Sequence, residues 1–348
     1  MSTRFLGKVG LLIALAASSA FAQYHQTNLV STFSNATPHK DPNLVNGWGI
    51  AAFPGSPYWI SDNGTGLSTL YDQAGNIIPL VVTIPPAPSQ PFGPKGTPTG
   101  IIANPSTGFQ VTENGVSGAA AFVFATEDGT ISGWSPAVDA TNAVIAVDNS
   151  STFALYTGLT FVPNGTHPLI YAADAVNNHI DVYNSLFHKV KSFSDPNAPA
   201  GLGVYGVQNL NGQIYVTFAN PVPFSGGAID VFDNQGNFIK QLTSNGPTGP
   251  LQGAWGMAMA PSNFGKFSNA LLVGNVDNGH INAFDPGSGA FLGSLMDSAT
   301  GNTIRIPGLW GLMFGSGNAT SGAKNDLFFS AGPDAYRRGI FGKIFPAN

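Results

Sequence analysis

The sequence predicts an all-β protein that folds as a six-bladed β-propeller. Three observations support this prediction. One unit of apolar runs recurs six times, the third run of several units alternates apolar and polar residues, and no stretch of about a dozen residues has a convincing helical period. Repeating units of about 40 to 58 residues that each hold four short strands are typical of propeller blades.

Each unit begins with a glycine that follows an aromatic residue or a threonine and precedes an apolar run. A second apolar run comes next, then a polar loop, and then a third run such as residues 229–233, which alternates strictly. Alternation of β-branched and aromatic residues with polar ones marks a half-buried strand. The six unit openings are Trp48-Gly49-Ile50, Thr99-Gly100-Ile101, Thr157-Gly158-Leu159, Tyr205-Gly206-Val207, Trp255-Gly256-Met257 and Trp310-Gly311-Leu312.

A turn and a fourth strand follow the third run in several units. The turns contain Asp or Asn together with a Gly, which suits the positive φ of a tight hairpin. They occupy residues 72–76, 233–237 and 285–289 and precede apolar runs at 77–82, 238–242 and 291–295. Each unit is therefore expected to form a sheet of four antiparallel strands.

The sixth unit lacks a fourth strand of its own. Its third run, residues 340–344, lies close to the end of the sequence, whereas residues 26–33 form an apolar run that belongs to no unit. Pairing of this N-terminal strand with the last blade would close the ring and cover an exposed strand edge. We expect this pairing to be the main closure of the propeller.

The remaining segments predict loops within a single domain, residues 23–348. The stretch 83–98 is rich in proline, residues 105–121 and 136–152 extend the second unit, and 315–326 is a Gly/Ser/Asn loop in the sixth. No interdomain linker is evident.

Composition excludes several functional classes. The chain of 348 residues has 13 Lys and Arg against 18 Asp and Glu, which gives a net charge of −5 and disfavours nucleic acid as a partner. It contains no cysteine, so disulfides, thiolate metal sites and a cysteine nucleophile are ruled out. The apolar share of 43% suffices for a packed core.

The first 22 residues have the pattern of a signal peptide. Arg4 and Lys8 form a basic start, residues 9–20 are apolar, and Ala20-Phe21-Ala22 matches a cleavage signal. An apolar stretch of this length is too short for a bilayer, which needs about 20 residues. We therefore expect an exported bacterial protein, periplasmic or extracellular, without a transmembrane segment and monomeric.

Four long motifs carry a resemblance to known proteins. They are residues 41–46 with Trp48-Gly49, residues 61–71, residues 124–134 and residues 308–311. The repeats resemble NHL-like propellers, and the motifs look like an uncharacterised family of exported six-bladed propellers, some of which carry a PEP-CTERM sorting tail. The resemblance implies the fold but no activity, and the end of this sequence, residues 345–348, has no such apolar tail.

Propeller geometry predicts two rings of side chains around one mouth of the central channel. The first ring consists of the residues before the repeat glycines, and the second consists of polar loop residues. From these rings we predict a ligand-binding set of Trp48, Tyr205, Trp255, Trp310, Asp62 and Asn63. Tryptophan and tyrosine present large surfaces with a polar edge, which suits stacking on sugars; the same residues could instead pack between blades.

Acidic residues at this mouth raise the question of a metal. Lactonases of the gluconolactonase type hold a divalent cation with acids at such positions, but here the first ring has three Trp, one Tyr and two Thr. The second ring offers Glu127, Asp174 and Asp277 as metal ligands, since hard cations prefer several carboxylate oxygens. The alternative is that these carboxylates only cap turns, so no cofactor is required.

Two hypotheses of function follow. The first is a secreted, non-catalytic binding or scaffold propeller that engages a glycan, a small molecule or a protein through its channel face. The second is a metal-dependent hydrolase, lactonase or lyase that uses the acidic loop residues on the same face. A purely structural role in the envelope stays open beside them.

Overall fold

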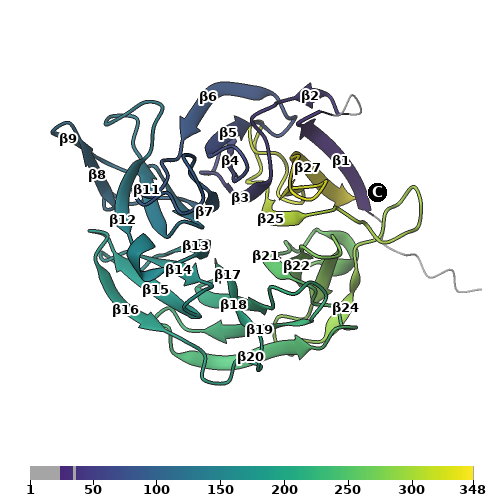
Figure 1. Ribbon diagram of the computed structural model, residues 1–348. Helices are drawn as coiled ribbons and strands as arrows, with labels where there is room; N and C mark the ends of the chain where they lie inside the picture. Colours follow the sequence, from purple (N-terminus) through teal and green to yellow (C-terminus); the bar gives the residue numbers. More distant parts are fainter. Residues whose placement is uncertain (1–23, 34–36, 348) are drawn as a thin grey trace, which may run out of the picture.

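The computed structural model describes residues 24–33 and 37–347 and forms a six-bladed β-propeller (Figure 1). The predicted signal peptide, residues 1–22, lies outside the described residues. Six sheets surround a central channel, and the only helical segments in the described ranges are two 3₁₀ turns, Ser150–Thr152 and Gly265–Phe267. No helix in this part of the chain has the length and apolar character needed to cross a membrane.

Each blade has its first strand next to the channel and its fourth at the rim (Figure 1). Blade 1 consists of β3 (Gly47–Ala51), β4 (Tyr58–Asp62), β5 (Leu67–Tyr71) and β6 (Ile77–Thr83). Blade 2 consists of β7 (Pro98–Ala103), β10 (Phe122–Thr126), β11 (Thr130–Trp134) and β12 (Val144–Asp148). Its insertion 105–121 forms a separate hairpin of β8 (Gln110–Glu113) and β9 (Val116–Ala119).

The next three blades follow the same order. Blade 3 consists of β13 (Tyr156–Val162), β14 (Leu169–Asp174), β15 (His179–Asn184) and β16 (Lys189–Phe193). Blade 4 consists of β17 (Gly203–Leu210), β18 (Gln213–Ala219), β19 (Gly227–Phe232) and β20 (Phe238–Asn245). Blade 5 consists of β21 (Ala254–Met259), β22 (Leu271–Asn275), β23 (Ile281–Phe284) and β24 (Phe291–Ser294).

Blade 6 is built from both ends of the chain, as the sequence predicts. Its strands are β25 (Leu309–Phe314), β26 (Leu327–Ala331), β27 (Ile340–Pro346), β1 (Tyr24–Ser31) and the short β2 (His39–Lys40). β1 runs antiparallel to β27 from Tyr24 opposite Pro346 to Ser31 opposite Ile340. The predicted closure of the ring by the N-terminal strand is confirmed.

Tyr24 also connects β1 to blade 5. Its side chain is fully buried, its hydroxyl donates a hydrogen bond of 2.9 Å to the Phe264 carbonyl, and its ring stacks on Phe267. Burial raises the pKa of Tyr24 to about 12. Tyr24, the first described residue of the chain, is therefore buried and hydrogen-bonded like a residue of the core.

The repeat glycines allow the six inner strands to approach one another. A Cβ atom on Gly49 would lie 2.5 Å from the Thr99 carbonyl oxygen, and one on Gly206 would lie 2.8 Å from the Trp255 carbonyl oxygen. The other four glycines meet the next blade in the same way, and the ring closes where Gly311 faces Trp48. Glycine recurs at this position because any side chain would strike the backbone of the neighbouring inner strand.

Candidate functional site

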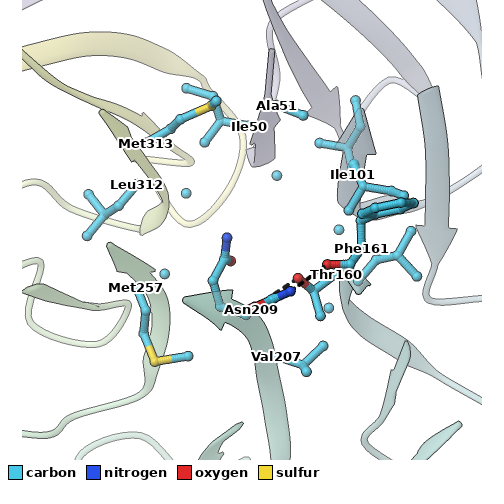
Figure 2. A pocket seen from close by; sticks show the side chains of 18 of the residues that line it. Ile50, Ala51, Ile101, Thr160, Phe161, Val207, Asn209, Met257, Leu312 and Met313 are labelled. Atoms are coloured by element: carbon cyan, nitrogen blue, oxygen red, sulfur yellow. Dashed lines mark hydrogen bonds between the residues drawn. The ribbon is translucent and has the colours of Figure 1, made fainter. Parts of the chain in front are cut away.

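The ring of glycines separates a cavity on one side from a packed aromatic cluster on the other. The cavity has a volume of about 270 Å³ and is lined by residues that follow the glycines, among them Ile50, Ile101, Phe161, Met257 and Leu312 (Figure 2). Its lining contains no ionisable side chain. The cavity therefore offers apolar contact and amide hydrogen bonds rather than acid–base chemistry.

The opposite side is the face on which the inner strands begin, and we call it the mouth face. The loops that join second to third strands, and one blade to the next, also lie on it. Here Trp48 and Trp310 stack at 3.7 Å between ring centroids, and Trp255 meets Trp310 edge-on at 5.8 Å. Trp48 and Trp310 are only 5% and 3% exposed, whereas Trp255 and Tyr205 are half-buried. The aromatic residues of the first ring thus pack against one another across the channel.

A chain of hydrogen bonds joins this aromatic cluster to Glu127. Trp310 Nε1 donates to Asn46 Oδ1 at 3.0 Å, Asn46 Nδ2 donates to Asn63 Oδ1 at 3.0 Å, and Asn63 Nδ2 donates to Glu127 Oε2 at 2.8 Å. Burial raises the pKa of Glu127, the bond from Asn63 opposes this, and the charge of Asp128 adds to it. The network connects blades 6, 1 and 2 at the mouth face.

Tyr205 lies near the predicted acids of two blades. Burial raises its pKa most strongly, and repulsion from the Tyr336 phenolate, should it form, and from the carboxylates of Asp277 and Glu127 raises it further. The carboxylate of Asp277 already has a hydrogen-bond partner within the protein, because its Oδ2 accepts the Phe224 backbone N–H at 2.7 Å. Glu127 and Asp277 thus both raise the pKa of the Tyr205 phenol.

The third predicted metal ligand has different partners. Asp174 lies in blade 3 with His179 and Asp181, and one ligand atom from each of the three falls within 4.8 Å of the others. His179 Nε2 is 3.1 Å from Asp181 Oδ1 and 3.8 Å from Asp174 Oδ2. This group could bind a metal ion, although Lys189 Nζ already lies 3.4 Å from Asp181. The structure does not place Glu127 or Asp277 in this cluster.

Asp62, predicted to bind ligand, is fully buried beneath the mouth face rather than exposed on it. Asn63, its neighbour, is partly exposed and belongs to the hydrogen-bond chain to Glu127. The six predicted ligand-binding residues therefore divide into a buried group and a half-exposed group. Their role in binding stays a prediction.

Exposed aromatic side chains on the mouth-face loops are a feature that the sequence analysis did not identify. Among them Phe153 is 80% exposed, Phe224 53% and Tyr336 46%. These three residues also have left-handed backbone conformations, with φ of 58°, 60° and 65°. Positive φ is a genuine outlier for bulky side chains. The two further exposed aromatic residues on these loops are Phe33 and Phe92.

In the sequence, each of these residues is a single aromatic inside a polar loop. This signal is weak, because the same pattern also occurs at aromatic residues that are buried beneath their loop. Phe187 illustrates this, since it also has a positive φ yet is buried. Only the folded loops distinguish the exposed residues from the buried one.

The fold and its channel define the class of protein as a six-bladed β-propeller. Its likeness to solved structures concerns the fold. Virginiamycin B lyase from Staphylococcus aureus has a TM-score of 0.52 at 12% identity, over 93% of this chain and 99% of that one. The gluconolactonase XC5397 from Xanthomonas campestris has a TM-score of 0.53 at 12% identity, over 88% and 87%. No protein-family model matches the chain.

Two proteins of Acanthamoeba polyphaga mimivirus align with nearly the whole sequence. Uncharacterized protein L690 is 29% identical over 343 residues, covering 93% of this chain and 86% of L690. Uncharacterized protein R648 is 30% identical over 332 residues, covering 91% of this chain and 78% of R648. The chain belongs to the family of R648. The bacterial source, the NHL-like repeat and the relation to PEP-CTERM proteins stay predictions.

Proposed function

We propose that the protein is a secreted, non-catalytic binding or scaffold propeller that engages a glycan, a small molecule or a protein through its mouth face. The observation that carries this proposal is the set of exposed aromatic side chains on the mouth-face loops, three of them in a left-handed conformation. Backbone strain in sparsely populated regions is associated with functional sites and persists only where the surrounding structure enforces it. The signal-peptide pattern of residues 1–22 supports export.

The half-exposed residues of the predicted set extend this surface. Tyr205, Trp255 and Tyr336 all contact Trp310, at 6.1, 5.8 and 5.8 Å between ring centroids. A ligand on the mouth face would therefore rest on a rigid aromatic base. Preorganised aromatic contacts of this kind lose little conformational entropy on binding.

The test is a binding screen of the mature protein on glycan and peptide arrays, with the double variant Phe153→Asn/Phe224→Asn beside it. Asparagine tolerates positive φ, so the loops can keep their shape while losing both rings. We expect any ligand of the wild type to bind the variant at least about tenfold more weakly. Leu186→Asn, an equally apolar exposed position on the opposite face, should bind normally. Equal binding by all three proteins would contradict the proposal.

A second candidate is a metal-dependent hydrolase, lactonase or lyase on the same face, with the metal at Asp174, His179 and Asp181 rather than at the predicted trio of Glu127, Asp174 and Asp277. It is favoured by the group of Asp174, His179 and Asp181, whose ligand atoms suit a metal ion, and by the raised pKa of Glu127 at the mouth face. Glu127→Gln discriminates between the candidates, because an enzyme of this kind would lose turnover of lactone or ester substrates with its fold intact. A binding protein would show no turnover in either form.

A further inference from the structure

Asp62 is a buried carboxylate without a hydrogen-bond partner. It is the last residue of β4, its side chain has no exposed surface, and neither carboxylate oxygen has a partner within hydrogen-bond distance. The hydroxyl of Thr69 on the adjacent strand β5 is likewise buried and makes no hydrogen bond of normal geometry, but it lies close enough to Asp62 to affect the pKa of that carboxyl. An ionised carboxylate in such surroundings is strongly unfavourable unless something compensates its charge.

A second aspartate faces this position from the segment that enters blade 1. Asp41 is 4% exposed, and its Oδ2 accepts the Tyr71 hydroxyl at 2.9 Å. Its Oδ1 accepts the Asn43 backbone N–H at 2.9 Å, so an Asp-Pro-Asn turn fixes the carboxylate in place. Burial raises the pKa of Asp62 well above its ordinary value, Thr69 lowers it in part, and the charge of Asp41 raises it again. The register of β4 and β5 places Asp62, Thr69 and Tyr71 on one face of blade 1, and Tyr71 binds Asp41, so the two carboxylates lie on the same side of the blade.

Another buried aspartate in this propeller shows how such charge can be compensated. Asp181 in blade 3 has Lys189 and His179 beside it. Asp230 in blade 4 is buried beside Asp195, which belongs to a second Asp-Pro-Asn turn, and like Asp62 it has no hydrogen-bond partner on either carboxylate oxygen. Asp41 and Asp62 have no such cationic neighbour, since no Lys, Arg or His in the described ranges forms an ion pair with them. Asp41 acts on Asp62 through its charge alone, without a hydrogen bond between the carboxyls.

We propose that Asp41, Asp62 and Thr69 hold a divalent cation of the calcium type between β4, β5 and the 41–46 segment. The two carboxylates and the hydroxyl supply oxygen ligands only, which suits a hard cation rather than zinc or copper. Two negative charges match a doubly charged ion, and water molecules would complete the coordination. This site is distinct from the predicted trio of Glu127, Asp174 and Asp277.

The cation would reinforce the ring where its two ends meet. The 41–46 segment leads from the closing strand into blade 1, and Leu44 within it packs in the same buried cluster as Phe328 and Phe341 of blade 6. Tyr71, which binds Asp41, stacks on Phe341 at 5.4 Å. An ion bound here would thus tie the entry segment to blade 1 directly beside the blade 6–blade 1 interface.

The experiment measures ion binding to the purified protein after treatment with chelator. Equilibrium dialysis against calcium or magnesium, with metal analysis, should find one tightly bound ion per chain in the wild type. The unfolding midpoint should rise by about 3–5 °C at roughly a hundredfold excess over the dissociation constant. Asp62→Asn and Asp41→Asn should each lose this ion and the rise in midpoint.

Two variants serve as controls. Asp174→Asn removes a carboxylate from the blade 3 cluster, and Asp72→Asn makes the same charge change in an exposed turn; both should keep the ion and the rise. If either aspartate variant fails to fold, Thr69→Val, which keeps the shape and removes one ligand, should weaken binding about tenfold or more. A wild type that binds no ion, or an ion that is kept by Asp62→Asn and lost by Asp174→Asn, would overturn the proposal.

Discussion

At the residue scale, the repeat glycines and the residues before them have one structural role. Each glycine lets the backbone of the next inner strand come close, and the residue before it turns toward the channel. In blades 2 and 3 that residue is threonine, and its hydroxyl binds the next blade: Thr99 Oγ1 donates to the Tyr156 carbonyl at 2.6 Å, and Thr157 Oγ1 to the Tyr205 carbonyl at 2.5 Å. Elsewhere it is an aromatic that fills the channel.

The close approach of the inner strands at the repeat glycines predicts different effects for a matched pair of substitutions. Gly206→Ala places a methyl group 2.8 Å from both the Trp255 carbonyl oxygen and Thr217 Oγ1, so it should lower the free energy of unfolding by about 1–3 kcal/mol. Gly246→Ala has open space around the new methyl group and no positive φ, so it should be neutral or slightly stabilising. Denaturant titration compares the two, and equal effects would show that backbone contact does not select the glycine.

The carboxyl pair of blade 4 predicts a dependence of stability on pH. Burial, together with the neighbouring carboxyl of Asp195, raises the pKa of Asp230 from 3.8 to about 8. The folded protein holds this proton more tightly than the unfolded chain, so the contribution is complete below pH 4 and is lost as the pH rises through 8. Asp230→Asn should therefore flatten the decline of the unfolding midpoint between pH 5 and pH 8. A variant that declines as steeply as the wild type would contradict the pairing.

At the element scale, the closing strand β1 has the clearest energetic role. It pairs with β27 along its whole length and buries Tyr24 and Val30, and in doing so it covers the free edge of blade 6. Without it the last blade would present three strands and an open edge to solvent.

Deletion of residues 23–33 should therefore lower the unfolding midpoint sharply. The comparison protein begins at residue 23, so that the two differ only in the closing strand. Calorimetry or circular dichroism measures the midpoint. An unchanged midpoint would mean that the pairing contributes little to the closed ring.

The blade pattern could be predicted from the sequence because it depends on local periodicity. The fourth strands expected at 77–82, 238–242 and 291–295 correspond to β6 (Ile77–Thr83), β20 (Phe238–Asn245) and β24 (Phe291–Ser294). The short hairpin of β8 and β9 inside the insertion 105–121 was expected only as an extension of blade 2.

The candidate site was less predictable, because it depends on contacts between blades. Asp62 and Asp174 both end the second strand of a blade, yet one meets Asp41 and the other meets His179 and Asp181. The left-handed φ at Phe153 and Phe224 is a property of the folded loops, since nothing in the residue type suggests it. Positions around the ring follow from the repeat, whereas side-chain partners follow from the packing of each loop.

At the scale of the whole molecule, the two sides of the ring differ in character. One side has a cavity without ionisable side chains, and the other has a packed aromatic centre surrounded by loops with exposed rings. We infer that these exposed rings are kept for binding and do not stabilise the fold.

The most direct test is the free energy of unfolding of Phe153→Asn/Phe224→Asn relative to the wild type. Because asparagine relieves part of the cost of positive φ, and the two rings are 80% and 53% exposed, we predict an increase in stability of about 1 kcal/mol or more. Leu186→Asn, which has no such strain, should leave the free energy of unfolding nearly unchanged. A loss of stability in the double variant would show that the rings hold their loops in place, and it would contradict the claim.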